Sequence, residues 1–374
     1  MATTGRVGPR SESARPAPAR PKLASSCTDP YDARVGRSVG IVGASGYAGA
    51  ELLRLVAGHP DLELAWATGE TAAGQAIRSL YPNLAAVVGD RTFAAYEPGA
   101  ADGLDLVLLA LPHGASSRLM AELRDQAEVV VDLAADFRLR DAGLYETWYG
   151  EAHACPELLG DFAYGLPELF RADLADARAV AAPGCYPTAA ALALTPLVRA
   201  GLVETTGIVV DAASGVSGAG RPPKTTTSFC TVDEDFRAYG LLDHRHTPEI
   251  EQAVGASVLF TPHLAPMNRG ILATGYARAT IGSTTTAQVL DTLRSAYDGE
   301  PFVVVSDEPP STKATLGSNC AHLSARSDPR TGWIVSLCAI DNLVKGAAGQ
   351  ALQCANLALG LDEVAGLPLA GLSP

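Results

Sequence analysis

The segment SVGIVGASGYAGAELLRLVAGHP, residues 38–60, constrains the fold more than any other part of the chain. Its apolar run at 39–42 predicts a buried strand, and the leucines beyond the turn recur at helical spacing. Between them Gly43, Gly46 and Gly49 are spaced as GxxGxxG. Glycines also serve plain turns, but after a strand and before a helix they permit a tight turn, close approach of a phosphate and close helix packing. The order therefore predicts an open α/β sheet that binds a dinucleotide, with its pyrophosphate on the amides at the helix start.

The next predicted strand, LELAWATG at residues 62–69, indicates which nicotinamide cofactor the site would take. NAD sites usually carry an acidic residue at the end of this strand, where it binds the ribose 2′-hydroxyl. Ala67, Thr68 and Gly69 occupy that place, and none of them would repel a 2′-phosphate. Glu70 follows one step later and keeps NAD possible, so the sequence favours NADP without excluding NAD.

Two further apolar runs predict parallel strands of the same sheet. The run LDLVLLALPHG, residues 104–114, is nearly continuous in apolar residues, as expected for a central strand covered on both faces, and it ends beside His113. The run EVVVDLAADFRL, residues 128–139, brings Asp136 and Arg138 to the same carboxyl edge, where open α/β sheets bind ligands. His113 could contact the cofactor or cap the next helix, and Arg138 could bind an anion or form a surface ion pair.

A lone cysteine lies at another such junction, in AVAAPGCYPTAA at residues 179–190. An apolar run stops at Pro-Gly, and the Ala/Leu-rich stretch from Thr188 predicts a helix, so Cys185 would lie on a strand-to-helix turn. The partial positive charge of a helix N-terminus lowers the pKa of a thiol and favours the nucleophilic thiolate. Cysteine is also among the most commonly buried residues, so a purely structural Cys185 is the alternative.

The segment GIVVDAASGVSGAGRPPK, residues 207–224, predicts a strand followed by a Ser/Gly loop. The loop carries Arg221 and Lys224. Backbone amides and basic side chains in such a loop can bind an anion, although flexible loops often have the same composition.

The segment LLDHRHTPEI, residues 241–250, places His244, Arg245 and His246 directly before a Thr-Pro-Glu helix start. Histidine exchanges protons near neutral pH, and arginine grips a carboxylate at two points. Three such groups in a row indicate a site rather than core packing.

Composition bounds what the chain of 374 residues can be. It is 47% hydrophobic and long enough for about two domains of ~100–200 residues. We expect no membrane association, because no apolar run is long enough to span a bilayer and the N-terminus lacks the apolar segment of a secretion signal. The seven cysteines are scattered without CxxC spacing, which argues against disulfides and a zinc site and favours the cytoplasm. A net charge of −13 gives no reason to expect a nucleic-acid partner, so an anionic substrate needs a local positive pocket.

The first 37 residues differ from the rest. They contain five prolines, and seven Lys and Arg residues against three Asp and Glu residues. Because they lack apolar periodicity, we expect a disordered tail. An Arg- and Ser-rich leader could also be a transit peptide, and the sequence does not decide between that and a plain extension.

Together these motifs resemble those of the N-acetyl-γ-glutamyl-phosphate reductase family of arginine biosynthesis. The resemblance extends from residue 38 to about residue 360 and includes GIVGASGYAGAELLRL, ALPHGASS, DLAADFRL, YGLPEL, APGCYPTAA, SGVSGAGR, HRHTPEI, TPHLAPMNRGI and DNLVKGAAGQALQ. A series of motifs in one order is far more specific than any single member. Only the N-terminal tail departs from the family's pattern.

The resemblance implies an α/β fold of the semialdehyde dehydrogenase type, with a Rossmann-type nucleotide-binding domain beside an α+β catalytic and dimerisation domain. Residues 38–184 would form the NADP-binding domain, completed by a C-terminal helix in residues 341–374. Residues 185–340 would form the catalytic domain. The resemblance also implies a homo-oligomer, either a dimer or a tetramer.

The activity implied is NADPH-dependent reduction of N-acetyl-L-glutamyl 5-phosphate to N-acetyl-L-glutamate 5-semialdehyde with release of phosphate. Cys185 would be the nucleophile and His246 the acid/base, without a metal; only the resemblance selects His246 over His244. The residues expected to contact NADP(H) are Gly43, Ser45, Gly46, Tyr47, Gly49, Thr68, Pro112, His113, Gly114, Ser214, Gly215 and Asn342. The residues expected to contact substrate are Arg138, Tyr164, Ser217, Arg221, His244 and Arg245. Within the second set, the 214–221 loop would bind the departing phosphate, and Arg245 or Arg138 the substrate's carboxylate.

Three alternatives remain. A reductase of aminoadipyl or aspartyl phosphate would share the thiol and the cofactor. A cysteine hydrolase would use the thiol and histidine without NADP, which the glycine-turn unit argues against. A non-catalytic NADP-binding sensor would need neither Cys185 nor the three residues at 244–246.

The strand end at residues 67–69 gives a testable cofactor preference. Because it has no acid to bind a ribose 2′-hydroxyl or repel a 2′-phosphate, we expect kcat/KM with NADPH to exceed that with NADH by at least about tenfold, or roughly 1.4 kcal/mol. Steady-state kinetics with both cofactors checks this. Equal use of the two would contradict the interpretation of this strand.

Overall fold

The computed structural model describes residues 1–3 and 36–373 of the chain, which divides into the units 1–35 and 36–374. The predicted disordered tail and the question of a transit peptide lie almost wholly in residues 4–35, outside the described residues. Strand β1 begins at Arg37, so the last residue assigned to the tail already belongs to a strand.

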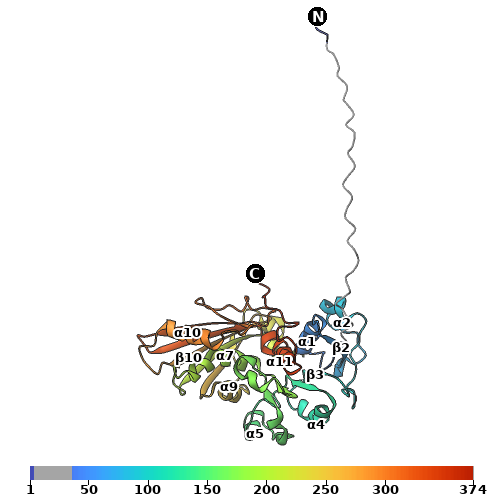
Figure 1. Cartoon of the computed structure of the whole chain (residues 1–374), viewed down its shortest axis with the longest axis horizontal. Coiled ribbons are helices and arrows are strands. Elements are labelled where there is room, and N and C mark those ends of the chain that lie inside the picture. Colours follow the sequence, from blue (N-terminus) through green and yellow to red (C-terminus); the bar gives the residue numbers. More distant parts are fainter. Residues whose placement is uncertain (4–35, 374) are drawn as a thin grey trace, which may run out of the picture. The chain divides into compact units, whose positions relative to one another are not determined.

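A parallel sheet of six strands forms around the glycine turn, in the order β2-β1-β3-β4-β6-β5. Figure 1 labels β2 and β3 of this sheet. Its strands are β1 (Arg37–Val42), β2 (Leu62–Ala67), β3 (Leu106–Leu109), β4 (Val129–Asp132), β5 (Ala163–Tyr164) and β6 (Ala179–Ala181). Every residue of β3 and β4 is buried, because helices cover both faces of the sheet. The predicted open α/β sheet is confirmed.

Helices connect these strands. They are α1 (Tyr47–Ala57), α2 (Ile77–Leu80), α3 (Ala85–Val88), α4 (Ser116–Gln126), α5 (Gly143–Tyr149) and α6 (Pro167–Phe170). At the start of α1, Gly43 has a φ of +80°, and a Cβ atom there would lie 2.5 Å from the carbonyl oxygen of Ala110. A Cβ atom at Gly49 would lie 2.5 Å from the carbonyl oxygen of Gly43. Side chains at these two positions would thus prevent the tight turn and the close helix packing.

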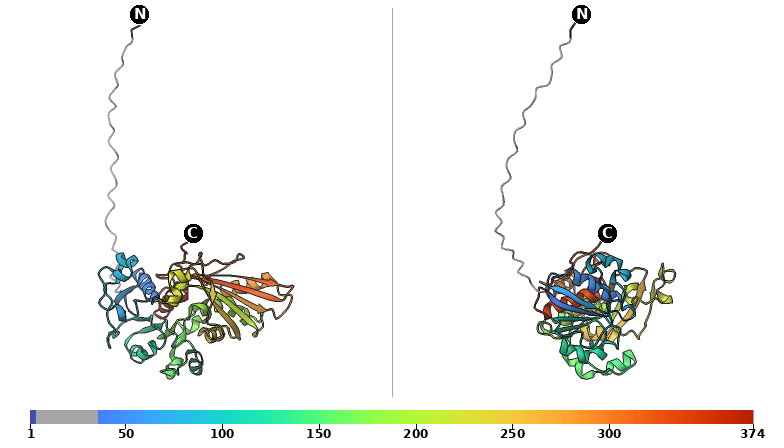
Figure 2. Two further views of the ribbon diagram at one scale, coloured as in Figure 1. Left: turned by 180° about the vertical axis from the view of Figure 1, so that it is seen from behind. Right: turned by 90° about the vertical axis from the view of Figure 1, so that its right-hand side faces the viewer.

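A second, mixed sheet has seven strands in the order β11-β12-β13-β10-β7-β9-β8. Its strands are β7 (Ile208–Gly215), β8 (Arg237–Ala238), β9 (Val258–Ala265), β10 (Ile271–Arg278), β11 (Val303–Val305), β12 (Ala321–Asp328) and β13 (Trp333–Ile340). Its helices are α7 (Cys185–Arg199), α8 (Phe229–Val232), α9 (Thr247–Val254) and α10 (Thr286–Ala296). Helix α7 packs on β10 and β13 and shares their hydrophobic core. Figure 2 shows the strands of this sheet from behind, coloured from yellow-green to red along the sequence.

The chain returns to the first sheet after β13. The π-helix Val344–Ala348 continues into α11 (Gly349–Ala358), which packs against β4 and α1 and shares a core with the glycine-turn unit. Figure 1 shows α11 between the two sheets. In the part of the chain that the structure describes, none of the helices combines the length and apolar character that a membrane crossing requires.

Candidate active site

Cys185 is the first residue of α7, on the turn that follows β6. The helix begins three residues before Thr188, where the sequence predicts its start. Pro187 lies in the first turn, where its missing N–H is not needed. Thr188 instead closes that turn, since its hydroxyl donates to the carbonyl of Gly184 at 3.0 Å.

The buried carboxylate of Glu249, on α9, forms a hydrogen bond with the backbone of this turn. Its Oε1 accepts hydrogen bonds from the backbone N–H of Gly184 at 2.8 Å and from the hydroxyl of Tyr164 at 3.0 Å. Its Oε2 lies 3.3 Å from Nη1 of Arg138. One carboxylate thus joins β5, the loop after β4 and the residue before the thiol.

The sequence predicts that Arg138 and Tyr164 contact the substrate. In the structure their polar groups instead form hydrogen bonds with other groups of the protein. Both residues are buried. Besides contacting Glu249, Arg138 donates from Nε to Ala182 at 2.9 Å and from Nη2 to Leu133 at 2.7 Å. These bonds support the turn that carries the thiol, and they leave Arg138 poorly placed to grip a carboxylate.

His246 lies against the residue that precedes the thiol. A Cβ atom at Gly184 would lie 2.6 Å from Nε2 of His246 and 2.9 Å from Nη1 of Arg138, so only glycine leaves room for both groups. The other ring nitrogen of His246, Nδ1, is buried and has no hydrogen-bond partner among the described residues. The imidazole of His246 thus approaches the backbone of the residue next to Cys185.

His244 orients the backbone of His246. Its Nδ1 accepts a hydrogen bond from the backbone N–H of His246 at 3.1 Å, so the proton of the neutral ring lies on Nε2. Burial and the neighbouring charge of Arg245 lower the pKa of His244 to about 4. The ring meets Tyr186 and Phe260 edge-on. His244 therefore acts here as a neutral acceptor within an aromatic enclosure.

The expectation of a low thiol pKa is wrong. Burial raises the pKa of Cys185 to about 11, although the Arg138 guanidinium and the backbone N–H of Tyr186 act in the opposite direction. Burial also lowers the pKa of His246 well below its usual range, and His244 and Arg138 add to that effect. Thiol and imidazole are therefore both neutral near pH 7, because the charges at the helix start do not offset the lost hydration.

The glycine turn is tied to its surroundings by hydroxyl groups. The backbone N–H of Gly43 donates to the hydroxyl of Thr68 at 3.3 Å. The hydroxyl of Tyr81 donates to the carbonyls of Ser45 at 2.7 Å and Gly46 at 3.1 Å. Tyr47, the next residue, is exposed at the start of α1.

The end of β7 is linked to helix α1 through Arg269. Ser214 is buried, and a Cβ atom at Gly215 would lie 2.7 Å from the backbone nitrogen of Arg269. The guanidinium of Arg269 lies 3.2 Å from a carboxylate oxygen of Glu51 on α1 and 3.1 Å from one of Asp341. The two groups of expected cofactor residues, on the glycine turn and after β7, are thus linked by ion pairs.

Asn342 connects this region to the thiol. Its Nδ2 donates to the hydroxyl of Ser217 at 2.9 Å, and its Oδ1 accepts from the backbone N–H of Gly270 at 2.7 Å. The chain then enters the π-helix, where a Cβ atom at Gly346 would lie 2.7 Å from Cβ of Cys185. The segment from Asn342 to Gly346 thus runs from the hydroxyl of Ser217 to the side chain of Cys185.

The other two arginines that are expected to bind substrate, Arg221 and Arg245, differ in burial. Nε of Arg221 is buried and has no hydrogen-bond partner among the described residues. Burial raises the pKa of Tyr81 to about 12, while the positive charge of Arg221 opposes this, so Arg221 lies toward the glycine turn. Arg245 is exposed.

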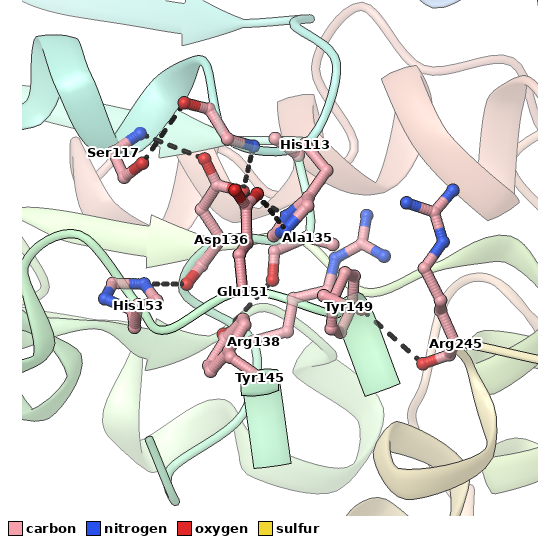
Figure 3. A network of polar contacts seen from close by, with 12 residues as sticks. His113, Ser117, Ala135, Asp136, Arg138, Tyr145, Tyr149, Glu151, His153 and Arg245 are labelled. Carbon is pink, nitrogen blue, oxygen red and sulfur yellow. Dashed lines mark hydrogen bonds and ion pairs between the residues drawn. The ribbon is translucent and has the colours of Figure 1, made fainter. Parts of the chain in front are cut away.

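His113 is held in a polar cluster after β3 (Figure 3). Its Nδ1 lies 2.5 Å from Oδ1 of Asp136, and its Nε2 lies 3.6 Å from Oε1 of Glu151. Burial acts to raise the pKa of Asp136, but His113 and the N–H groups of Gly114 and Ser117 lower it to about 2. His113 does not cap α4, which has no side-chain cap.

Sequence reasoning missed two buried groups. Glu249 was hidden because an acid in the first turn of a helix is expected on electrostatic grounds alone. The second group is a buried ion pair between Lys345 and Glu168, whose Nζ and Oε1 lie 2.6 Å apart; Gln353 contacts both. The motifs YGLPEL and DNLVKGAAGQALQ contain these residues, but no local pattern pairs them.

No cluster of three or more His, Cys, Asp and Glu side chains in the described residues could hold a metal ion.

Comparison with known proteins defines the class. The family model "Semialdehyde dehydrogenase, NAD binding domain" matches residues 38–177, and "Semialdehyde dehydrogenase, dimerisation domain" matches residues 185–342. Two solved structures share the fold. Aspartate semialdehyde dehydrogenase II of Vibrio cholerae, complexed with ASA, has a TM-score of 0.63 and 19% identity, covering 86% of this chain and 98% of that chain. The enzyme of Candida albicans with NADP has a TM-score of 0.59 and 14% identity, with coverage of 86% and 98%. The chain has the fold of a semialdehyde dehydrogenase and belongs to that class of oxidoreductase.

Closer relatives narrow the class. The N-acetyl-γ-glutamyl-phosphate reductase of Symbiobacterium thermophilum is 48% identical over 342 residues, covering 89% of this chain and 98% of the relative. That of Rhodospirillum rubrum is 46% identical over 349 residues, covering 90% and 99%. The chain belongs to the N-acetyl-γ-glutamyl-phosphate reductase family. The dimerisation-domain match also supports a homo-oligomer.

The raised thiol pKa predicts how Cys185 reacts with an alkylating agent. With a pKa of about 11, roughly one thiol in ten thousand is ionised at pH 7, and the fraction grows about tenfold per pH unit. The rate of iodoacetamide labelling of Cys185, followed by peptide mass spectrometry, should rise without a plateau from pH 6.5 to 9.5. The Cys185→Ser variant corrects for labelling of the exposed Cys230. A plateau near pH 7 to 8 would show that the helix start and Arg138 outweigh burial.

Proposed function

We propose that the protein reduces N-acetyl-L-glutamyl 5-phosphate with NADPH to N-acetyl-L-glutamate 5-semialdehyde and phosphate, in arginine biosynthesis. The observation that carries this proposal is the turn at residues 183–185. It presents a thiol at a helix start, leaves room at Gly184 for the His246 imidazole, and lies in a chain whose relatives are named for this reaction.

The first half-reaction is acyl transfer to Cys185. The thiol sulfur attacks the acyl carbon, the bond between that carbon and the phosphate oxygen breaks, and phosphate leaves. Nε2 of His246 lies at Gly184 and accepts the thiol proton as the carbon–sulfur bond forms. The N–H groups at the start of α7 face the oxyanion of the tetrahedral intermediate. The product is a thioester on Cys185.

The second half-reaction converts the thioester to the aldehyde. Bound NADPH would supply the hydride that reduces the thioester carbon. A thioester accepts a hydride far more readily than a free carboxylate does. The resulting thiohemiacetal collapses, the carbon–sulfur bond breaks, and the sulfur regains a proton from His246. The low pKa of His246 favours this last step, because the protonated imidazole releases its proton readily.

The residues of the glycine turn fit a dinucleotide. A Cβ atom would collide with backbone at Gly43 and Gly49, and α1 begins directly after Gly46. These residues with Ser45, Tyr47 and Thr68 would hold the adenosine and pyrophosphate part of NADP(H). The 112–114 turn, Ser214, Gly215 and Asn342 would contact the nicotinamide half. Residues 38–184 with the C-terminal helix would then form the cofactor domain and residues 185–340 the catalytic domain.

Substrate contacts follow from the placement of the polar groups. Ser217 lies beside Asn342 and is the better placed of the loop residues for the departing phosphate. Arg221 lies toward the glycine turn, where its unpartnered Nε suits a cofactor phosphate. Arg245 is exposed and is our choice for the substrate's carboxylate.

The oligomer is a homodimer or homotetramer built on the open face of the seven-stranded sheet. On this face an apolar row crosses four strands, formed by Leu259, Val209, Tyr276 and Val335, which are paired in register. Leu259 is 50% exposed and the other three are half-buried. A second copy of the same face would cover this row.

We also propose the cytoplasm as the location of the enzyme. The mechanism requires Cys185 as a free thiol, and all six cysteines in the described residues are unpaired. A reducing compartment keeps them so.

The reaction is tested most simply in reverse. The purified protein should reduce NADP+ only when both N-acetyl-L-glutamate 5-semialdehyde and inorganic phosphate are present, with formation of NADPH followed at 340 nm. Aspartate semialdehyde and aminoadipate semialdehyde serve as matched competitors. A kcat/KM for either of them equal to or above that for the acetylated substrate would replace the proposed substrate with that compound.

A further inference from the structure

Arg245 rests on an aromatic ring contributed by another part of the chain. Its guanidinium centre lies 5.5 Å from the ring centroid of Tyr149, within the range of a cation–π contact. The hydroxyl of Tyr149 donates to the backbone carbonyl of Arg245 at 3.5 Å (Figure 3). Within residues 36–373 no carboxylate forms an ion pair with Arg245, so its guanidinium is available to an anion.

Tyr149 is itself fixed in place. It is the last residue of α5, and Gly150 ends the helix in the left-handed conformation with a φ of +80°. Its ring lies 5.3 Å from that of Tyr145, whose hydroxyl donates to the carbonyl of Ala135 at 3.1 Å. Neither the helix end nor the neighbouring ring leaves Tyr149 free to change its orientation.

The ring of His113 lies 4.2 Å from that of Tyr149 and tilted by 40°. His113 is in turn held by Asp136, which accepts hydrogen bonds from Gly114 at 2.7 Å and Ser117 at 3.0 Å. His113 and Tyr149 therefore form a packed pair anchored to the carboxyl edge of the first sheet. Arg245, in the loop before α9, rests on this pair.

We propose that Tyr149 is a positioning residue for substrate binding, which acts by holding the guanidinium of Arg245 where it meets the substrate's carboxylate. An exposed arginine loses considerable side-chain entropy when it binds, and a ring that already orients its planar group reduces that loss. The inference rests on the proposed function of Arg245. It assigns a role to a tyrosine that lies about 100 residues away in the sequence and touches neither the thiol nor His246.

Substitutions of Tyr149 distinguish the contribution of its ring from that of its hydroxyl. Tyr149→Phe keeps the ring, so its KM for N-acetyl-L-glutamate 5-semialdehyde should stay within about twofold of the wild-type value. Tyr149→Leu removes the ring and should raise KM for N-acetyl-L-glutamate 5-semialdehyde roughly five- to tenfold, the range expected for a cation–π contact, with kcat and KM for NADP+ within about twofold. Tyr149→Met fills the space without a ring and repeats the test if the leucine variant is poorly folded by circular dichroism. A fall in kcat with unchanged semialdehyde KM would overturn the proposal.

A double-mutant cycle identifies the path of the effect. If Tyr149 acts through Arg245, Tyr149→Leu should cost nothing further in KM once Arg245→Ala is present. Effects that multiply in the double variant would overturn the proposal while leaving the carboxylate role of Arg245 in place. An unchanged KM in Arg245→Ala alone would overturn both roles, and the reductase activity of that variant would still stand as support for the proposed reaction.

Discussion

The carboxylate of Glu249 is the group on which the catalytic turn depends. It is fully buried and binds Gly184, Tyr164 and Arg138 at once. Removal of one partner from a buried ion pair typically costs ~3–5 kcal/mol, since the remaining charge is left without compensation. The loss would fall on the strand-to-helix turn that presents Cys185, because Arg138 also binds the carbonyl of Ala182 beside it. Loss of the Glu249 carboxylate should therefore lower the stability of the protein and displace the turn that carries Cys185.

The same enclosure determines the charge state of the reacting groups. Burial moves the pKa of the thiol upward and that of the imidazole downward, so a neutral pair is favoured over a thiolate–imidazolium pair. A neutral thiol is protected from adventitious oxidation and alkylation. In the proposed mechanism the thiol becomes a nucleophile only as an activated acyl group arrives and His246 takes the proton, which would restrict its reactivity to the intended substrate class. Arg245 lies outside this enclosure, exposed on the ring of Tyr149, where we propose that it binds the substrate's carboxylate.

Local patterns in the sequence were sufficient for the architecture but not for the interior of the site. The glycine turn, the strands at 104–114 and 128–139, and the placement of Cys185 at a strand-to-helix turn depend on neighbouring residues, and all three are seen. Threonine before an alanine run is typical of an N-cap and predicts the start of α7 at Thr188. The helix begins at Cys185 instead, because Pro187 is tolerated in a first turn. The partners of Glu249 lie 65, 85 and 111 residues away in the chain, so no spacing could reveal them. The position of Cys185 at a helix start predicts a lowered thiol pKa, but burial raises it, and burial depends on packing that periodicity does not quantify.

The central claim is that Cys185 carries the acyl group, and trapping that intermediate tests it most directly. Protein incubated with N-acetyl-L-glutamyl 5-phosphate in the absence of NADPH, quenched in acid and digested, should yield one acylated peptide containing Cys185, and hydroxylamine should remove the adduct. The Cys185→Ser variant should give no such thioester and no reduction. An acyl adduct on another residue, or a fully active serine variant, would contradict the account and leave Cys185 a structural residue of the turn.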